Sequence, residues 1–176
     1  MTVTLVLGGA RSGKSRYAEG LAQGERHYIA TAQSFDAEMT LRIAQHQQQR
    51  GPGWITHEEV FDLATRLEAL NKRGNFILVD CLTLWLSNLM LADRDVATAV
   101  QGLLSTLENN VADVVFVSNE VGMGLVPETP LGRAFRDQQG KFNQQIASVA
   151  DRVVFVAAGL PLALKATLPA SQAKPT

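Results

Sequence analysis

The stretch LVLGGARSGKSRYAEGLA, residues 5–22, joins an apolar run to a glycine cluster and then to a polar, helix-like segment. Within it, Gly8, Gly13, Lys14 and Ser15 complete the pattern G-x-x-x-x-G-K-S. When this pattern follows a strand and opens a helix, its backbone N–H groups wrap phosphate oxygens. We therefore interpret it as a phosphate-binding loop (P-loop) rather than a plain turn between strand and helix. Lys14 is predicted to reach the outer phosphates and Ser15 to bind Mg²⁺.

The composition is that of an ordinary globular domain. The chain has 176 residues, of which 46% are hydrophobic and 19% charged, and 16 basic against 17 acidic residues give a net charge of −1. This balance gives no indication of nucleic-acid binding or of an anionic membrane partner. The N-terminus lacks a basic signal region, and no apolar run approaches the ~18 residues of a membrane span, so we expect a cytoplasmic protein without membrane insertion.

Short apolar runs alternate with helix-like segments, which is typical of a parallel sheet with crossover helices. Strands are predicted at residues 2–7, 27–31, 76–80, 113–119 and 152–158, with an extra edge strand at 54–57. Helices are predicted at residues 13–23, 36–49, 60–73, 82–91, 96–108 and 131–150. Continuous apolarity in four of the strands predicts burial on both faces, so the fold class is α/β with a mostly parallel central sheet and helices on both faces. We expect one domain over residues 1–166 and a disordered tail at 167–176.

Two strand ends carry acidic or amide groups that suit a phosphate site. Asp80 ends the apolar run FILVD, where a carboxylate can anchor the metal of a nucleoside triphosphate. It can also cap the helix predicted from residue 82, and the two roles are compatible. Asn119 and Glu120 follow another strand in a similar way, and either meet the acceptor substrate or a metal-bound water, or belong to a solvated loop.

A helix-like segment holds one histidine between two arginines. In SFDAEMTLRIAQHQQQRGPGW, residues 34–54, Arg42, His46 and Arg50 follow at intervals of four and share a helix face. Two flanking guanidinium groups disfavour the charged imidazolium, which leaves a ring nitrogen free to attack phosphorus near neutral pH. The alternative is an ordinary solvated histidine on a helix surface.

The remaining histidines and the single cysteine have simpler interpretations. His27 and His57 look structural, and no histidine pair has the spacing of a metal site. Cys81 excludes an internal disulfide, and it is interpreted as a small core residue, with a reactive thiol as the alternative.

Several segments together resemble the bifunctional adenosylcobinamide kinase and adenosylcobinamide-phosphate guanylyltransferase family of cobalamin biosynthesis. They are LVLGGARSGKSRYAE, YIATAQSFDAEMTLRIAQHQQQRGPGW, ILVDCLTLWLSNLM, VSNEVGMGLVPETPLGRAFRDQQGKFNQ and DRVVFVAAGLPLALK. The resemblance implies a P-loop NTPase fold like that of the recombination ATPases (RecA-like) and a homotrimer. It also implies two reactions. ATP or GTP phosphorylates adenosylcobinamide, and GTP then transfers GMP to adenosylcobinamide phosphate through a guanylyl-histidine, which gives adenosylcobinamide-GDP and pyrophosphate.

The resemblance also implies roles for residues at matching positions. His46 would be the guanylylated residue, with Lys14 as the other catalytic group and Mg²⁺ held by Ser15 and Asp80. Nucleotide contacts are expected from Gly8, Gly9, Ala10, Arg11, Ser12, Gly13, Lys14, Ser15, Ala30, Thr31, Ala32, Gln33, Gln47, Gln48, Gln49, Arg50, Glu58 and Asp80. Glu58 is assigned to this contact, with its neighbour Glu59 as the alternative.

Other interpretations stay open at this point. The chain could be a single-activity P-loop kinase for another small alcohol, or a regulatory module that binds nucleotide without transfer, although no N-K-x-D motif of a regulatory GTPase is present. The segment 121–133 is either a lid over the corrinoid substrate or a connecting loop. The apolar helix at 82–91 belongs either to the core or to a trimer interface.

Overall fold

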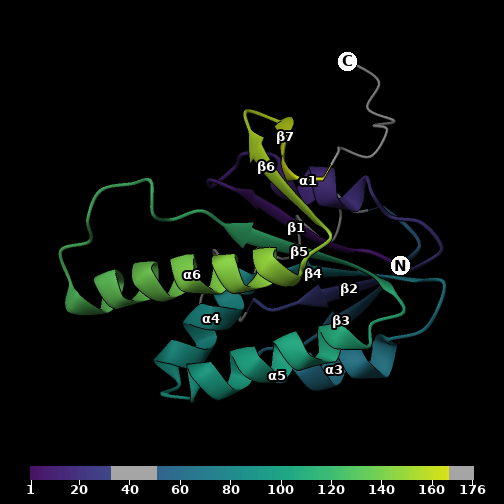
Figure 1. Ribbon diagram of the computed structural model, residues 1–176, viewed down its shortest axis with the longest axis horizontal. Coiled ribbons are helices and arrows are strands. Elements are labelled where there is room, and N and C mark those ends of the chain that lie inside the picture. The colour runs from purple at the N-terminus through teal and green to yellow at the C-terminus, as the bar shows by residue number, and fades with distance from the viewer. Residues whose placement is uncertain (33–50, 167–176) are drawn as a thin grey trace.

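Seven strands form one sheet that carries helices on its faces in the computed structural model, which describes residues 1–32 and 51–166 (Figure 1). The strands are β1 (Val3–Gly8), β2 (Glu25–Ala30), β3 (Trp54–Glu58), β4 (Asn75–Asp80), β5 (Asp113–Asn119), β6 (Arg152–Ala157) and β7 (Leu160–Lys165). The helices are α1 (Lys14–Glu19), α3 (Leu63–Leu70), α4 (Leu82–Leu91), α5 (Val96–Glu108) and α6 (Pro130–Val149).

The sheet has the strand order β3-β2-β4-β5-β1-β6-β7. Neighbouring strands from β3 to β6 are all parallel, and only β7 runs antiparallel to its neighbour. The predicted mostly parallel sheet is therefore confirmed. Because parallel strands end at the same edge, the P-loop strand β1 and the Asp80 strand β4 both end at one edge of the sheet, with β5 between them.

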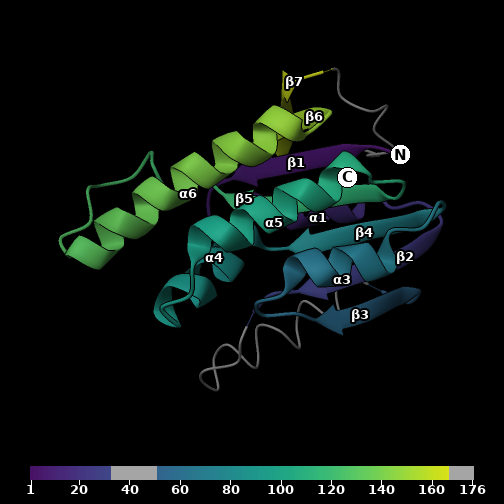
Figure 2. The ribbon, with the colours of Figure 1, turned by 60° about the horizontal axis from the view of Figure 1, so that its bottom comes forward.

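The core lies on both faces of the sheet, as the continuous apolar strands predicted. In β4, Ile77 and Val79 pack on one side, in a cluster with side chains of α3, α4, α5 and α6. Phe76 and Leu78 alternate to the other side, where Ala18 of α1 joins the cluster. Figure 2 shows the same arrangement, with α3, α4, α5 and α6 on one face of the sheet and α1 on the other.

The apolar helix α4 belongs mainly to the core of the subunit. Leu82, Trp85, Leu86 and Leu89 are at most 2% exposed, whereas Leu91 at the end of the helix is 64% exposed. The core alternative therefore explains the apolar character of this helix without an interface between subunits. In the residues that the structure describes, no helix is long and apolar enough to cross a membrane.

The structure adds one strand that the sequence analysis did not predict. β7 follows β6 through the two residues Ala158 and Gly159, whose φ angles of 50° and 77° match the tight turn that favours a hairpin. Pro161 obscured the strand signal because proline cannot donate to a sheet ladder, and it is tolerated here because β7 is an edge strand.

Two helices are shorter than predicted. Helix α1 ends at Glu19, before Gly20, and α3 spans residues 63–70 instead of 60–73. Ahead of α3, the Glu59 carboxylate accepts the N–H groups of Phe61 and Asp62, so these residues form a turn instead of helix. The helix predicted at 36–49 and the tail predicted from residue 167 lie outside the described residues.

Candidate nucleotide-binding site

The P-loop is held tightly between β1 and the β6–β7 turn. A Cβ atom on Gly8 would lie 2.5 Å from the backbone oxygen of Val156 and 2.5 Å from Ser12 Oγ. Gly13 has a φ of 94°, and a Cβ there would approach Gly159 Cα to 3.2 Å. The N–H of Gly159 also donates to the backbone oxygen of Ser12 at 2.8 Å. Gly8 is therefore required by space and Gly13 chiefly by its backbone conformation.

Lys14 lies across the loop that it belongs to. Its Nζ donates to the backbone oxygen of Gly9 at 3.0 Å, and the residue is only 9% exposed. Burial lowers the pKa of Lys14, while Cys81 and the carboxylate of Asp80 act in the opposite direction. A partly desolvated ammonium group beside the loop is well suited to bind a phosphate oxygen, since its attraction for an anion is less screened by water.

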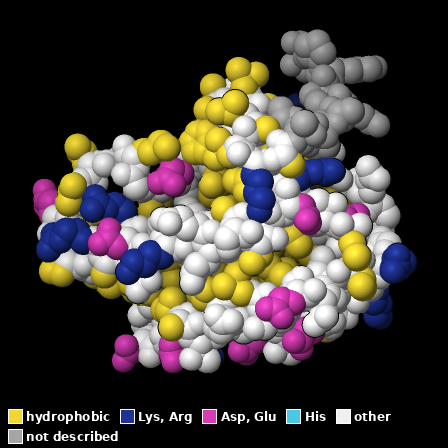
Figure 3. All heavy atoms as spheres, viewed as in Figure 1, with side chains coloured by type: hydrophobic (Ala, Val, Ile, Leu, Met, Phe, Trp, Pro, Cys, Tyr) yellow, Lys and Arg dark blue, Asp and Glu magenta, His cyan; other side chains and the backbone are white. Residues whose placement is uncertain are grey.

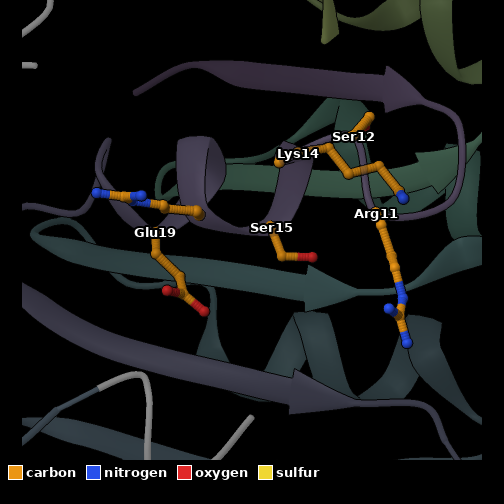
Figure 4. A pocket seen from close by; sticks show the side chains of 7 residues that line it. Arg11, Ser12, Lys14, Ser15 and Glu19 are labelled. Atoms are coloured by element: carbon orange, nitrogen blue, oxygen red, sulfur yellow. The ribbon is translucent and has the colours of Figure 1, made fainter. Parts of the chain in front are cut away.

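A cavity of about 620 Å³ opens beside this lysine. Its lining comes entirely from the loop and helix α1: Arg11, Ser12, Gly13, Lys14, Ser15, Arg16 and Glu19. Figure 4 shows the Lys14 side chain extending along the loop toward its turn. The side chains of Arg11 and Ser15 both point away from Lys14. The volume is in the range of small-molecule and cofactor sites.

Asp80 stands at the same edge of the sheet. It pairs in register with Ala30 of β2, which in turn pairs with Glu58 of β3, and Gly8 pairs with Asn119 of β5. The strand order therefore brings together residues from five separate segments of the predicted site. A serine hydroxyl and a carboxylate are oxygen donors of the kind that Mg²⁺ prefers. Among the described residues, no cluster of three or more His, Cys, Asp and Glu side chains offers a different metal site.

Thr31, predicted as a nucleotide contact, has its side chain engaged beneath the site. The residue is fully buried, its hydroxyl donates to the backbone oxygen of Cys81 at 2.7 Å, and it accepts the N–H of Cys81 at 2.8 Å. Its own backbone oxygen accepts a bond from the Asn88 side chain at 2.8 Å, and its N–H donates to the backbone oxygen of Asp80. Thr31 thus fixes the end of β2 to the residue that follows Asp80.

Replacing Thr31 by valine is expected to lower the free energy of unfolding by about 1–3 kcal/mol, because the isosteric side chain leaves the buried N–H of Cys81 without a partner and leaves its carbonyl only the bond from the Trp85 N–H. Urea denaturation followed by circular dichroism measures the change. Thr56→Val, at an exposed position of β3, is the matched control and should shift stability by less than about 0.5 kcal/mol. Equal losses in both variants would contradict the role given to Thr31.

Glu58, the last residue of β3, and Glu59, which follows it, differ in their side-chain contacts. Glu59 is engaged: its Oε1 accepts the N–H groups of Phe61 and Asp62, and its Oε2 lies 3.6 Å from Arg66 Nε. Glu58 is exposed at the end of β3, beside Ala30. This difference favours Glu58 over Glu59 as the residue available to a ligand.

A buried polar network supports the end of β5. Ser118 donates to Asn143 Oδ1 at 2.7 Å and accepts from Gln139 Nε2 at 3.0 Å. The backbone of Asn119 is held from both sides, since its N–H donates to Thr83 Oγ1 at 2.8 Å and its oxygen accepts from Asn143 Nδ2 at 3.1 Å. The network joins α4, β5 and α6 directly below the edge that carries Asn119 and Glu120.

Sequence reasoning missed these supporting residues. Thr83, Asn88, Gln139 and Asn143 are buried polar residues of α4 and α6 that match no motif. The sequence signal that could have found them is a polar side chain on an otherwise apolar helix face. Such a side chain is expected to be buried, and buried polar groups are nearly always hydrogen-bonded. That signal indicates a buried partner but does not say which one.

The thiol of Cys81 is enclosed by the core. Burial, together with the nearby Asp80 carboxylate, raises the pKa of this thiol to about 12. The thiol therefore stays protonated at neutral pH, which supports the core interpretation. We expect a disulfide reagent such as dithionitrobenzoate to leave the native protein unmodified at pH 8 and to titrate one thiol after denaturation. Rapid modification of the native protein would indicate an accessible thiolate instead.

Part of the predicted site lies outside the described residues. This holds for His46 and its flanking Arg42, and for the nucleotide contacts Gln33, Gln47, Gln48, Gln49 and Arg50. His27 and His57, interpreted as structural, contact each other with 3.1 Å between Nδ1 and Nε2.

Comparison with known proteins identifies the family. Residues 4–164 match the family described as cobinamide kinase / cobinamide phosphate guanyltransferase. The chain belongs to this family. The bifunctional adenosylcobalamin biosynthesis protein CobP of Pseudomonas aeruginosa is 46% identical, over 92% of this chain and 96% of the relative. The corresponding protein CobU of Escherichia coli is 39% identical, over 92% of this chain and 98% of the relative.

Membership of the cobinamide kinase family makes the chain a transferase of cobalamin biosynthesis with a P-loop. A solved ATPase from a bacterial type III secretion system shares the fold, with a TM-score of 0.53 at 12% identity. The alignment covers 92% of this chain and 56% of that one. The expected α/β P-loop NTPase fold is thereby confirmed, and the expected family with it.

Proposed function

We propose that the P-loop edge of this chain carries out both reactions of the family, with Lys14 serving each of them. The observation that carries the proposal is the meeting of the P-loop, the buried side chain of Lys14 and the Asp80 carboxylate at one sheet edge. A triphosphate bound there presents its γ-phosphoryl group for the kinase step and its α-phosphorus for guanylyl transfer.

In the kinase step, the aminopropanol hydroxyl of adenosylcobinamide attacks the γ-phosphorus of ATP or GTP, its oxygen forms the new P–O bond and the nucleoside diphosphate leaves. The P-loop N–H groups and Lys14 stabilise negative charge that develops on the transferring group and on the leaving diphosphate. The hydroxyl proton passes to a base that we do not assign. The rigid packing of Gly8 and Gly13 keeps these donors oriented before the substrate arrives.

In the guanylyl step, a neutral ring nitrogen of His46 attacks the α-phosphorus of GTP, and pyrophosphate leaves as the bond to the β-phosphate oxygen breaks. The phosphate of adenosylcobinamide phosphate then attacks the same phosphorus, which releases His46 and forms adenosylcobinamide-GDP. Arg42 and Arg50, at four-residue spacing around His46, would hold the transferring phosphoryl group by bidentate hydrogen bonds. Gln33, Gln47, Gln48, Gln49 and Glu58 complete the proposed nucleotide contacts.

Ser15 and Asp80 would hold the Mg²⁺ that accompanies the triphosphate, which would neutralise charge on the phosphate oxygens. Two protein oxygen ligands suit a cation that keeps several waters and binds phosphates directly. We further propose a cytoplasmic homotrimer, in line with the family resemblance.

The test incubates the full chain and Mg²⁺ with GTP labelled at the α-phosphate or, in a separate reaction that also contains adenosylcobinamide, with GTP labelled at the γ-phosphate. We expect the α-label to stay on the protein in an acid-labile, alkali-stable bond, and the γ-label to appear in adenosylcobinamide phosphate. A chain that phosphorylates adenosylcobinamide but takes up no α-label would be a single-activity kinase. A chain that binds GTP without either transfer would be a regulatory module.

A further inference from the structure

The loop that connects β5 to α6, residues 121–129, stands out among the described segments at the site. Figures 1 and 2 both show it projecting beyond the end of β5, at the sheet edge that also carries the P-loop. It is the segment interpreted from sequence as either a lid or a plain connection. Its contacts and its side chains distinguish these two possibilities.

Both ends of the loop are anchored. At its start, the N–H of Glu120 donates to the backbone oxygen of Gly8 at 3.1 Å, so the loop leaves the sheet in direct contact with the P-loop. At its end, the Arg133 guanidinium donates to the backbone oxygens of Pro127 and Glu128 at 3.0 and 2.7 Å, and Thr129 caps α6. These contacts therefore fix the points at which the loop leaves the sheet and enters α6.

Those middle residues are large, apolar and exposed. Met123 is 80% exposed, Leu125 95% and Val126 64%, and Leu131 in the first turn of α6 is 56% exposed. Figure 3 shows apolar side chains on the surface of this loop. Exposed loops are ordinarily polar, and a group of apolar side chains beside a catalytic crevice marks a ligand or partner surface.

We propose that Met123, Leu125 and Val126 bind the corrinoid macrocycle of the acceptor, an inference that rests on the proposed function. The reacting hydroxyl lies at the end of a flexible arm and must reach the phosphate above the P-loop, so the macrocycle lies outside the phosphate site. The loop begins in contact with the P-loop and extends outward from it. A corrinoid presents a broad face edged with methyl groups and carboxamides, which aliphatic side chains can cover and backbone groups can hydrogen-bond.

The chemistry of the three side chains suits this ligand better than the nucleotide. A nucleotide offers an aromatic base, a sugar and phosphates, which are bound by polar groups and stacking. The unbranched thioether of Met123 and the flexible Leu125 instead adapt to an irregular aliphatic surface. The β7 side chains Leu160, Leu162 and Leu164 are also exposed, but they alternate along an edge strand that starts beside the P-loop at Leu160 and runs to the other end of the sheet, where Leu164 lies.

The test compares the double variant Met123→Ser/Leu125→Ser with Leu164→Ser, which changes an exposed leucine at the opposite end of the sheet. Binding of adenosylcobinamide is measured by equilibrium dialysis with detection by its visible absorbance, and binding of GTP by calorimetry. We expect the double variant to weaken adenosylcobinamide binding by about tenfold or more, with GTP binding unchanged, because two apolar contacts are lost. Leu164→Ser should leave both affinities at the wild-type value.

Three results would overturn the proposal: unchanged adenosylcobinamide binding in the double variant, a parallel loss of GTP binding, or a changed number of subunits by light scattering. The last would make the loop an interface between copies of the chain. These outcomes are distinct from failure of the proposed function, which would appear as a wild-type chain that binds adenosylcobinamide and GTP without transferring either group.

Discussion

Replacing His46 by alanine should abolish the covalent label that the wild-type chain takes up from α-labelled GTP. Guanylyl transfer should fall at least about a thousandfold, since the covalent intermediate loses its nucleophile. Phosphorylation of adenosylcobinamide should persist, because the γ-phosphoryl group passes directly to the hydroxyl and needs only the P-loop and Lys14. Both readouts come from one preparation, with denatured protein assayed for label and the supernatant for adenosylcobinamide phosphate.

His57→Ala is the matched control for this experiment. His57 lies on the edge strand β3 beside His27, and its ring nitrogen contacts the ring of that residue. Burial lowers the pKa of His57, so it is also a neutral imidazole at pH 7 and tests whether any neutral histidine can accept the label. We expect full labelling of His57→Ala. Label that survives in His46→Ala, or disappears in His57→Ala, would show that another residue is the nucleophile.

The parts of the site that follow from local sequence were predictable. The P-loop depends on glycine spacing within eight residues, and Asp80 depends on its place at the end of an apolar run. The parallel sheet followed from the alternation of apolar runs with helix-like segments. In each of these cases, the feature depends on a pattern of neighbouring residues or segments along the chain, so a single sequence is sufficient to predict it.

The supporting contacts were not predictable because they join segments far apart in the chain. The hydroxyl of Thr31 serves the backbone of Cys81, fifty positions away, and Asn88 holds Thr31 in turn. Nothing in the sequence around Thr31 distinguishes such a structural bond from a ligand contact. Similarly, Glu58 and Glu59 are equivalent in sequence, and only the turn at Phe61 and Asp62 shows which of them is engaged.

Replacing Lys14 by methionine is expected to lower both activities by about 10²–10⁴-fold, including the formation of the covalent adduct. The ammonium of Lys14 is a buried positive charge of the P-loop, and its loss leaves charge on the transferring phosphates less stabilised. Methionine keeps the length and apolar stem of lysine while removing a buried charge, so the thermal unfolding temperature should not fall. Assays of adduct formation and of kinase turnover at saturating GTP measure the effect.

The Lys14 and His46 variants together test whether one triphosphate site serves both reactions. If a single site does so, Lys14→Met impairs adduct formation and phosphorylation in parallel, whereas His46→Ala impairs guanylyl transfer alone. Lys141→Met, at an exposed position of α6, controls for the loss of a positive charge and should leave both activities intact. If Lys14→Met instead stopped phosphorylation while adduct formation continued at the wild-type rate, the GTP that guanylylates the chain would have to bind away from the P-loop. That result would contradict the single site, because the pocket beside Lys14 is lined by residues of the P-loop and α1.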